Sequence, residues 1–236
     1  MQESLPNGIT LCWSAAHFRP GTDSMVLADF ARPAAQDTVC DLGCGCGTLS
    51  LLLLAAHPHI RVTGVELQSD AAALARENAA QDKLHGRFSV LEGDLRDPAV
   101  LPAGAFDCAV SNPPYYPVAS GYAAQDAALR AARTEEFCTL PELCQAAARL
   151  LRWHGRFFLV HKPERLTDVL CALRAVSLEP KRLQFVRHSV KTPASLVLIA
   201  AVRGGKPGLT LLPDCTLFTP DGTPTPDHDR IYHQED

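Results

Sequence analysis

The chain has 236 residues, 47% of them hydrophobic and 20% charged, and its formal net charge at pH 7 is −4. A chain of this length and composition can form one α/β domain with a large core, and nothing in it requires a second domain. No apolar span is long enough for a membrane helix, and the start lacks a basic region followed by an apolar one. We therefore expect a cytoplasmic protein without a membrane partner.

Strands and helices are predicted to alternate along the chain. The predicted strands cover 38–42, 60–65, 87–91, 105–111 and 156–161, and the predicted helices cover 47–57, 70–83, 139–150 and 163–176. Such alternation is typical of a mostly parallel sheet with helices on both faces. Two later apolar runs, 183–188 and 195–202, lack a helical pattern between them and predict an antiparallel hairpin at one edge. The long segment 115–138 contains no convincing strand, which favours a functional loop with a short helix over 123–132.

The first predicted strand leads into a glycine-rich loop, Gly43-Cys44-Gly45-Cys46-Gly47. Strand, glycine loop and helix open a nucleotide-binding unit, because glycines let the backbone approach a ligand and the helix start offers free N–H groups. Thr48 follows the last glycine, so the spacing is not G-x-G-x-x-G, and a dinucleotide pyrophosphate is a less favoured ligand. Asp41, just before the loop, suits an ammonium group or a water.

The cysteines do not predict a metal site. Cys44 and Cys46 have a Cys-x-Cys spacing, but no second Cys or His pair lies near them. The chain has nine cysteines, and several lie in apolar strands or helices: Cys40, Cys108, Cys144 and Cys171. They are typical of small buried apolar side chains in a reducing compartment rather than of a disulfide framework.

Acidic residues close the next two predicted strands. Glu66 lies about twenty residues past the glycine loop, where an acid commonly bonds ribose hydroxyls. Glu92 and Asp94 follow the third predicted strand. Ser69-Asp70 is predicted to cap the helix that joins the second strand to the third. Because the carboxyl ends of parallel strands meet at one edge of a sheet, we expect these carboxylates to lie beside the glycine loop.

The fourth predicted strand ends in a rigid tetrapeptide, Asn112-Pro113-Pro114-Tyr115. Two consecutive prolines end the strand, because each fixes its own φ and neither can continue a ladder of hydrogen bonds. The turn therefore holds an amide and an aromatic ring in fixed directions. It lies at the edge where open α/β sheets bind their ligands.

These motifs together resemble the class I S-adenosylmethionine-dependent methyltransferases. The tetrapeptide is similar to that of the subset that methylates planar exocyclic nitrogens. The upstream stretch Phe18-Arg19-Pro20-Gly21-Thr22-Asp23-Ser24 resembles the motif that these N-methyltransferases place across the methionine end of the cofactor.

The resemblance implies a single Rossmann-like domain over 1–236 with a mostly parallel seven-stranded sheet. An N-terminal extension over 1–36 would carry the upstream motif, and 203–236 would be a surface tail. The cofactor would be S-adenosyl-L-methionine, which becomes S-adenosyl-L-homocysteine. The residues that the resemblance assigns to its binding are Arg19, Thr22, Asp23, Asp41, Gly43, Cys44, Gly45, Gly47, Glu66, Leu67, Asp94, Leu95 and Asn112.

Over almost its whole length the chain is similar to bacterial tRNA methyltransferases that modify N6 of the adenine next to the anticodon of valine tRNA. The similarity includes the run 157–166 and the stretch 179–183 as well as the motifs above. It implies structured RNA, in particular tRNA, as the partner. Relatives with the same tetrapeptide methylate guanine amines in ribosomal RNA or a glutamine amide in release factors. A non-catalytic RNA-binding protein on the same fold is a more remote alternative.

The catalytic residues implied are those of the tetrapeptide. The lone pair of adenine N6 is delocalised into the ring, so the amine is a poor nucleophile. We expect the Asn112 side-chain carbonyl and the Pro113 backbone carbonyl each to accept one amine hydrogen and aim the lone pair at the methyl group. Pro114 would supply stiffness, and Tyr115 would stack on a base that has left its own stack. No catalytic histidine is expected, because the proton becomes acidic once the methyl group has arrived.

The net negative charge does not favour nucleic-acid binding, but the charge is unevenly distributed. Residues 149–206 hold twelve Lys and Arg against three acids, Glu164, Asp168 and Glu179. The predicted RNA contacts lie in the long loop and near the late strands: Arg130, Arg133, Lys181, Arg182, Arg187 and Lys191. We expect them to form a basic rim around the site, suited to an RNA stem-loop with a splayed base.

Overall fold

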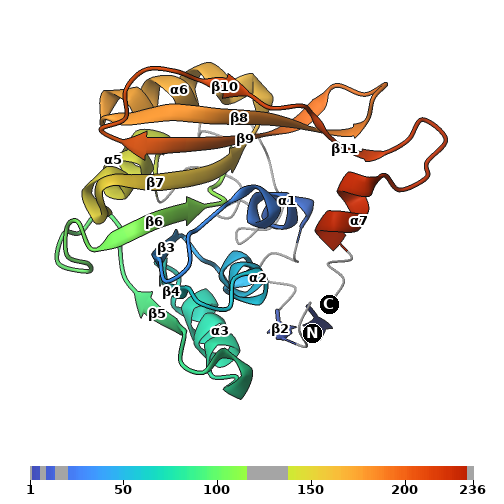
Figure 1. The fold of residues 1–236 in the computed structure, drawn as a ribbon. Helices are drawn as coiled ribbons and strands as arrows, with labels where there is room; N and C mark the ends of the chain where they lie inside the picture. The colour runs from blue at the N-terminus through green and yellow to red at the C-terminus, as the bar shows by residue number, and fades with distance from the viewer. Residues whose placement is uncertain (1, 6–8, 14–20, 116–137, 233–236) are drawn as a thin grey trace, which may run out of the picture.

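The computed structural model describes residues 2–5, 9–13, 21–115 and 138–232. A nine-stranded sheet runs through them in the order β10-β8-β9-β7-β6-β3-β4-β5, and β11 also pairs with β8 (Figure 1). The strands of this sheet are β3 (Thr38–Leu42), β4 (Arg61–Glu66), β5 (Phe88–Glu92), β6 (Phe106–Ser111), β7 (Leu151–His161), β8 (Leu178–Ser189), β9 (Ala194–Arg203), β10 (Thr210–Leu211) and β11 (Cys215–Phe218). A separate antiparallel pair joins β1 (Gln2–Ser4) to β2 (Thr10–Cys12).

Pairing in the large sheet is parallel except around β9, which runs antiparallel to both β7 and β8. The predicted parallel sheet and the late antiparallel hairpin are therefore confirmed. Seven of the strands are the predicted ones, and β10 and β11 are additional. Both are short and pair with the outer side of β8, so the hairpin does not form the extreme edge.

The helices are α1 (Thr22–Phe30), α2 (Thr48–Ala56), α3 (Ser69–Ala79), α5 (Leu140–Leu150), α6 (Leu166–Ala175) and α7 (Pro226–Tyr232). α3 ends earlier than predicted and is followed by the 3-10 turn η2 (Asp82–Leu84), while the 3-10 turn η4 (Pro163–Arg165) precedes α6. The predicted Ser69 cap is wrong. Gln68 occupies the N-cap position, and the Ser69 hydroxyl donates to Glu92 Oε1 at 2.6 Å because β5 ends beside α3.

Two hydrophobic cores cover the two faces of the sheet. In β7, Phe158 and Val160 belong to the core beneath α1 and α2, whereas Phe157 and Leu159 belong to the core beneath α5 and α6. This alternation follows from the pleat, because successive side chains of a strand point to opposite faces. Burial on both faces also explains why the central strands are almost wholly apolar.

The C-terminal part of the chain is not the surface tail that the sequence predicts. β11 lies beside β8, and α7 lies beside α1 (Figure 1). Cys215, Leu217 and Ile231 in these two elements are buried in the same core as α1. The apolar residues of this segment are too few to form a periodic pattern. They are enough to anchor it, because β8 supplies the backbone hydrogen-bond partners of β11.

All nine cysteines are free thiols in this structure. Cys40, Cys108 and Cys144 are buried as predicted, but Cys171 is exposed because it lies on the outer side of α6. Within the described part of the chain, no helix is both long and apolar enough to cross a membrane.

Candidate active site

The glycine loop, the strand-end acids and the tetrapeptide converge at the edge of the sheet where β3, β4, β5, β6 and β7 end, hereafter the carboxyl edge. The parallel pairing of β3 with β4 and β6 brings the glycine loop beside Glu66 and beside the tetrapeptide. β8 ends at the same edge, because β9 runs antiparallel to both β7 and β8.

The glycine loop wraps over the end of β4. The Gly43 and Cys44 N–H groups donate to the Val65 carbonyl at 2.9 and 3.0 Å, and the Gly45 N–H donates to Glu66 Oε2 at 2.8 Å. Gly43 and Gly45 have φ values of +73° and +55°, and a Cβ atom on either would meet no heavy atom within 4 Å. The positive φ requires glycine, and the open space leaves room for a ligand against the backbone.

The last loop glycine has a different, packing role. A Cβ atom on Gly47, whose φ is +87°, would lie 2.9 Å from the Phe88 ring. Gly64 in β4 is equally restricted, since its Cβ would lie 2.6 Å from Cys44 Sγ. Gly64 is not among the site residues that the sequence predicts. A lone glycine inside an apolar strand indicates that a neighbouring backbone or side chain approaches closely.

Asp41 is a buried carboxyl group directly beneath the loop. It is 1% exposed, and its Oδ2 accepts the Ser50 hydroxyl at 2.7 Å. Burial raises the pKa of Asp41 to about 7, and the Ser50 hydrogen bond opposes this rise. A cationic group bound at the loop would favour the ionised form.

Glu66 lies at the end of β4 with both oxygens engaged by backbone groups. Gly45 N–H and Gln68 N–H each donate to one oxygen at 2.8 Å, and the residue is 6% exposed. Each carboxylate oxygen can accept more than one hydrogen, so Glu66 can hold the loop and still receive hydroxyl groups. Leu67, next in the chain, is 39% exposed.

Asp94 is paired with Arg96 in this structure. Arg96 Nη2 lies 2.6 Å from Asp94 Oδ2 and its Nη1 lies 3.3 Å from Glu142, which ties the loop after β5 to the start of α5. The hydrogen bonds from Arg96 lower the pKa of Asp94. Leu95 packs against the core beneath α5 and α6.

The tetrapeptide contacts the start of α1. Asn112 Nδ2 donates to Ser24 Oγ at 3.1 Å, and the Tyr115 hydroxyl lies 2.5 Å from Asp23 Oδ2 and 2.7 Å from Asn112 Oδ1. A hydroxyl carries one hydrogen, so it donates to one of these oxygens at a time. The upstream motif and the tetrapeptide are thus in contact. The Thr22 hydroxyl is bonded to Tyr232 at 2.9 Å, and Arg19 lies outside the described residues.

The end of β7 and the following turn η4 bring three residues to Tyr115 that the sequence does not predict for the site. The His161 ring meets the Tyr115 ring edge to face at 5.4 Å between centroids, and Lys162 Nζ lies 5.0 Å from that ring centroid. Arg165 Nη1 donates to the Tyr115 carbonyl at 3.1 Å. The predicted parallel sheet could have indicated these residues, because β7 pairs in parallel with β6 and therefore ends beside the tetrapeptide.

His161 is neutral and acts as a packing residue. Burial, with a contribution from Arg165, lowers its pKa to about 4. Its Nδ1 accepts the Lys162 N–H at 2.9 Å, which leaves the proton on Nε2.

The predicted basic rim is only partly placed at the carboxyl edge. Lys181 and Arg182 lie in the first half of β8, where Lys181 donates to the Lys206 carbonyl and Arg182 covers the Phe30 ring at 4.8 Å. Arg187 is paired with Asp214. Lys191 is exposed in the turn after β8. Arg130 and Arg133 lie outside the described residues.

Among the residues that the structure describes, no group of three or more His, Cys, Asp or Glu side chains could hold a metal ion. Cys44 and Cys46, whose spacing raised the question, are buried and face local partners. Burial raises the pKa of both thiols, which favours the protonated form over the thiolate that a metal would need.

The glycine loop, the strand-end acids and the tetrapeptide lie in one segment, and a family model matches this segment. The model describes the methyltransferase small domain and covers residues 11–171, from β2 into α6. The chain belongs to this family. Its fold, a mostly parallel Rossmann-like sheet with an antiparallel β9, is that of the class I methyltransferases, as the resemblance implied.

Relatives of this methyltransferase include two curated proteins called tRNA1(Val) (adenine(37)-N6)-methyltransferase. The one from Porphyromonas gingivalis is 34% identical over 176 residues, which cover 72% of this chain and 68% of the relative. The one from Aeromonas hydrophila is 35% identical over 185 residues, covering 78% and 76%. Among solved structures, a predicted O-methyltransferase from Agrobacterium tumefaciens has a TM-score of 0.72 at 21% identity, covering 89% of this chain and 95% of that one. At this identity the likeness supports the fold alone.

Proposed function

We propose that this methyltransferase transfers a methyl group from S-adenosyl-L-methionine to the N6 amine of adenine in tRNA, at the adenine next to the anticodon of valine tRNA. The names of the relatives support the acceptor, and the tetrapeptide supports the chemistry. The observation that carries the proposal is the Asn112 carboxamide, held at the carboxyl edge by Ser24 on one side and Tyr115 on the other. The enzyme would work as one domain in the cytoplasm.

The residues at the glycine loop fit the cofactor. When bound, S-adenosyl-L-methionine supplies an electrophilic methyl group on a sulfonium. Gly43 and Gly45 leave open space over the backbone, and Asp41 offers a buried negative charge for an ammonium group. Glu66 can accept ribose hydroxyls with its remaining lone pairs. Arg96 donates to both oxygens of Asp94, so Asp94 would receive the adenine amine with a remaining lone pair of one of them.

The tetrapeptide orients the acceptor amine. Ser24 fixes the Asn112 carboxamide so that its oxygen faces the Tyr115 hydroxyl, and an amide oxygen has a second lone pair for an amine hydrogen. The Pro113 carbonyl would take the other hydrogen. Acceptors that are held in place before the reaction stabilise the transition state without a cost of reorganisation.

Tyr115 would act with both its ring and its hydroxyl. Its ring is packed edge to face on the neutral ring of His161, and this contact restricts the orientation of the Tyr115 ring. The hydroxyl donates to Asp23 or Asn112 and thereby links α1 to the carboxamide. A base that stacks on the face of the ring covered by Lys162 would displace that side chain.

The RNA backbone would approach from the side of β7 and β8. Lys162 and Lys191 follow these two strands at the carboxyl edge, so both can reach phosphates around a base inserted beside Tyr115. Lysine and arginine contacts with phosphates dominate the affinity of such complexes.

The test is a comparison of acceptors. Purified protein is incubated with labelled S-adenosyl-L-methionine and, separately, total bacterial tRNA, ribosomal RNA and a release factor. We expect label in the tRNA. Label only in ribosomal RNA would favour a guanine-N2 methyltransferase, and label only in the release factor would favour a protein-glutamine methyltransferase. No label in any acceptor, although the protein binds the cofactor, would favour the non-catalytic alternative.

A further inference from the structure

We infer that the C-terminal strap, defined as residues 215–232 with β11 and α7, positions α1 against the catalytic tetrapeptide. The inference rests on the proposed function for the role of the tetrapeptide and adds a segment that lies outside the matched family region. Arg230 and Tyr232 are the positioning residues. Neither touches Asn112 or Tyr115 directly in the contacts described here, and each acts through α1.

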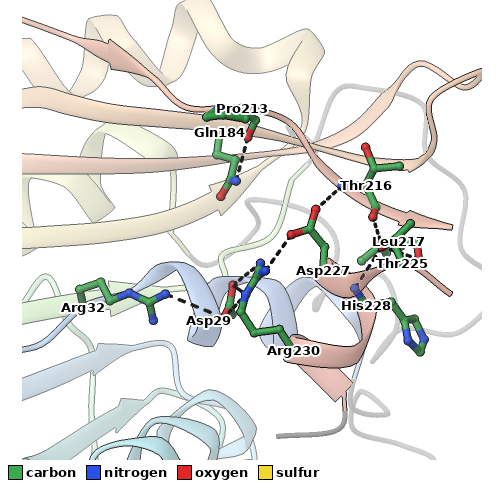
Figure 2. Close-up of polar contacts among 10 residues, drawn as sticks. All are labelled: Asp29, Arg32, Gln184, Pro213, Thr216, Leu217, Thr225, Asp227, His228 and Arg230. Carbon is green, nitrogen blue, oxygen red and sulfur yellow. Dashed lines mark hydrogen bonds and ion pairs between the residues drawn. The ribbon is translucent and has the colours of Figure 1, made fainter. Parts of the chain in front are cut away.

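The first attachment joins α7 to the last turn of α1. Arg230 donates to Asp29 from Nε and Nη2, at 3.1 Å to Oδ1 and 3.1 Å to Oδ2 (Figure 2). Its Nη1 donates to Asp227 Oδ1 at 2.8 Å, and Asp227 Oδ2 accepts the Thr216 N–H of β11 at 3.0 Å. A planar guanidinium that bonds two carboxylates at once has a defined orientation. α1 is therefore tied through α7 to β11 and so to the sheet.

The second attachment joins α7 to the first residue of α1. The Tyr232 hydroxyl donates to Thr22 Oγ1 at 2.9 Å. The Tyr232 ring is stacked on His228, with centroids 4.6 Å apart and an interplanar angle of 23°. His228 in turn lies 5.0 Å from Phe218, the last residue of β11. The ring of Tyr232 thus has neighbours that fix its direction, and Ile231 between the two attachments is buried.

α1 has nine residues and buries Val26, Leu27 and Phe30 in the core. Its first turn has no side-chain cap, because its N-cap residue is Gly21. The strap holds both of its ends, and its first turn contains Asp23 and Ser24, which contact Tyr115 and Asn112. Loss of either attachment would let the first turn shift relative to the tetrapeptide.

The test uses the full chain and measures two quantities for each variant: affinity for S-adenosyl-L-homocysteine by calorimetry and the rate of methyl transfer to tRNA. The variants are Tyr232→Phe, Arg230→Gln and Arg230→Lys. Arg174→Gln is the matched control. It removes an ion pair with Glu179 at the beginning of β8, at the end of that strand away from the carboxyl edge. Thermal unfolding of each variant defines a temperature at which all of them are folded.

We expect Tyr232→Phe to lower the affinity, the rate or both by about two- to tenfold, the range for one hydrogen bond. Arg230→Gln should lower them at least as much, and Arg230→Lys should recover part of the loss, while Arg174→Gln matches the wild type. Losses in Tyr232→Phe no larger than in Arg174→Gln would overturn the inference. If Arg230→Gln does not fold, Tyr232→Phe decides alone, because it removes a single oxygen atom.

The affinity for S-adenosyl-L-homocysteine distinguishes a failure of the strap's positioning role from a failure of the proposed function. Binding of S-adenosyl-L-homocysteine requires no acceptor, so a failure of tRNA as acceptor would leave that measurement valid. Conversely, a strap without influence on either quantity would leave transfer to tRNA by the wild-type protein intact.

Discussion

At the scale of single residues, the Tyr115 hydroxyl changes the expected role of the tetrapeptide. The sequence predicts that only the ring contributes, through stacking. In the structure the hydroxyl is within hydrogen-bond reach of both Asp23 and Asn112, so it also helps to orient the carboxamide. The motif identifies the residue, but the partner of the hydroxyl comes from α1, which is distant in sequence.

Variants of the tetrapeptide should therefore show graded effects. Tyr115→Phe should lower the rate of transfer by about two- to tenfold, the range for one lost hydrogen bond, and Tyr115→Ala should lose more because it also removes the ring. Asn112→Ala should lower the rate by about a hundredfold or more, as for a preorganised polar group at a reacting centre. Single-turnover kinetics measures each. Equal activity of the Phe variant and the wild type would show that the hydroxyl has no orienting role.

Asp41 should make cofactor binding depend on pH. Its folded-state pKa of about 7 means that it is mostly protonated at pH 6 and mostly ionised at pH 8. Only the ionised form attracts an ammonium group. Affinity for S-adenosyl-L-homocysteine should therefore rise with pH over this window, by at most about tenfold per unit below the pKa. Calorimetry at pH 6, 7 and 8 measures this.

Two variants control for this titration. Asp41→Asn, which is neutral throughout, should bind weakly at every pH without the rise. Ser50→Ala should move the rise to higher pH, because the Ser50 hydrogen bond lowers the pKa of Asp41. If the affinity of Asp41→Asn rose with pH as much as that of the wild type, the pH dependence would belong to another group.

At the scale of elements, the sequence predicts those strands and helices whose apolar residues recur with a clear period or that adjoin a compact motif. The strand, glycine loop and helix around Gly45, and the proline-ended strand before Asn112, could be placed because their residues are restricted by local backbone requirements. β10, β11 and α7 could not be placed, because their apolar residues are few and their burial depends on contacts with β8 and α1. The role of Lys162 and Arg165 depends likewise on the parallel pairing of β6 with β7.

Gly64 offers a test of how β4 supports the loop. Gly64→Ala would place a Cβ atom 2.6 Å from Cys44 Sγ, so the loop must shift. We expect destabilisation of about 1–3 kcal/mol, as for overpacking of a core, with weaker binding of S-adenosyl-L-homocysteine. Denaturant unfolding and calorimetry measure the two effects. The double variant Gly64→Ala/Cys44→Ala, which removes the sulfur, should recover part of both. Wild-type stability and affinity in the single variant would contradict this packing.

At the scale of the whole molecule, charge is distributed so that RNA could approach an acidic protein. The net charge is −4, yet the segment 149–206, which contains β7, β8 and β9, holds twelve Lys and Arg against three acids. Some of these cations are engaged in ion pairs, such as Arg187 with Asp214. Lys162 and Lys191 follow β7 and β8 at the carboxyl edge.

Binding of tRNA should therefore weaken as salt rises, with a slope set by the number of phosphates contacted. The double variant Lys162→Glu/Lys191→Glu should bind tRNA more weakly and with a shallower slope, while its affinity for S-adenosyl-L-homocysteine stays close to that of the wild type. Filter binding at several salt concentrations measures the slope, with Arg174→Gln as control. An unchanged slope in the double variant would place the RNA on another surface.

Identification of the methylated nucleoside is the most direct test of the proposed function. Valine tRNA lacking the modification is incubated with the protein and S-adenosyl-L-methionine, then digested and analysed by mass spectrometry. We expect N6-methyladenosine at the position next to the anticodon, and almost none with Asn112→Ala. A different methylated nucleoside, or the same product at an undiminished rate from Asn112→Ala, would contradict it.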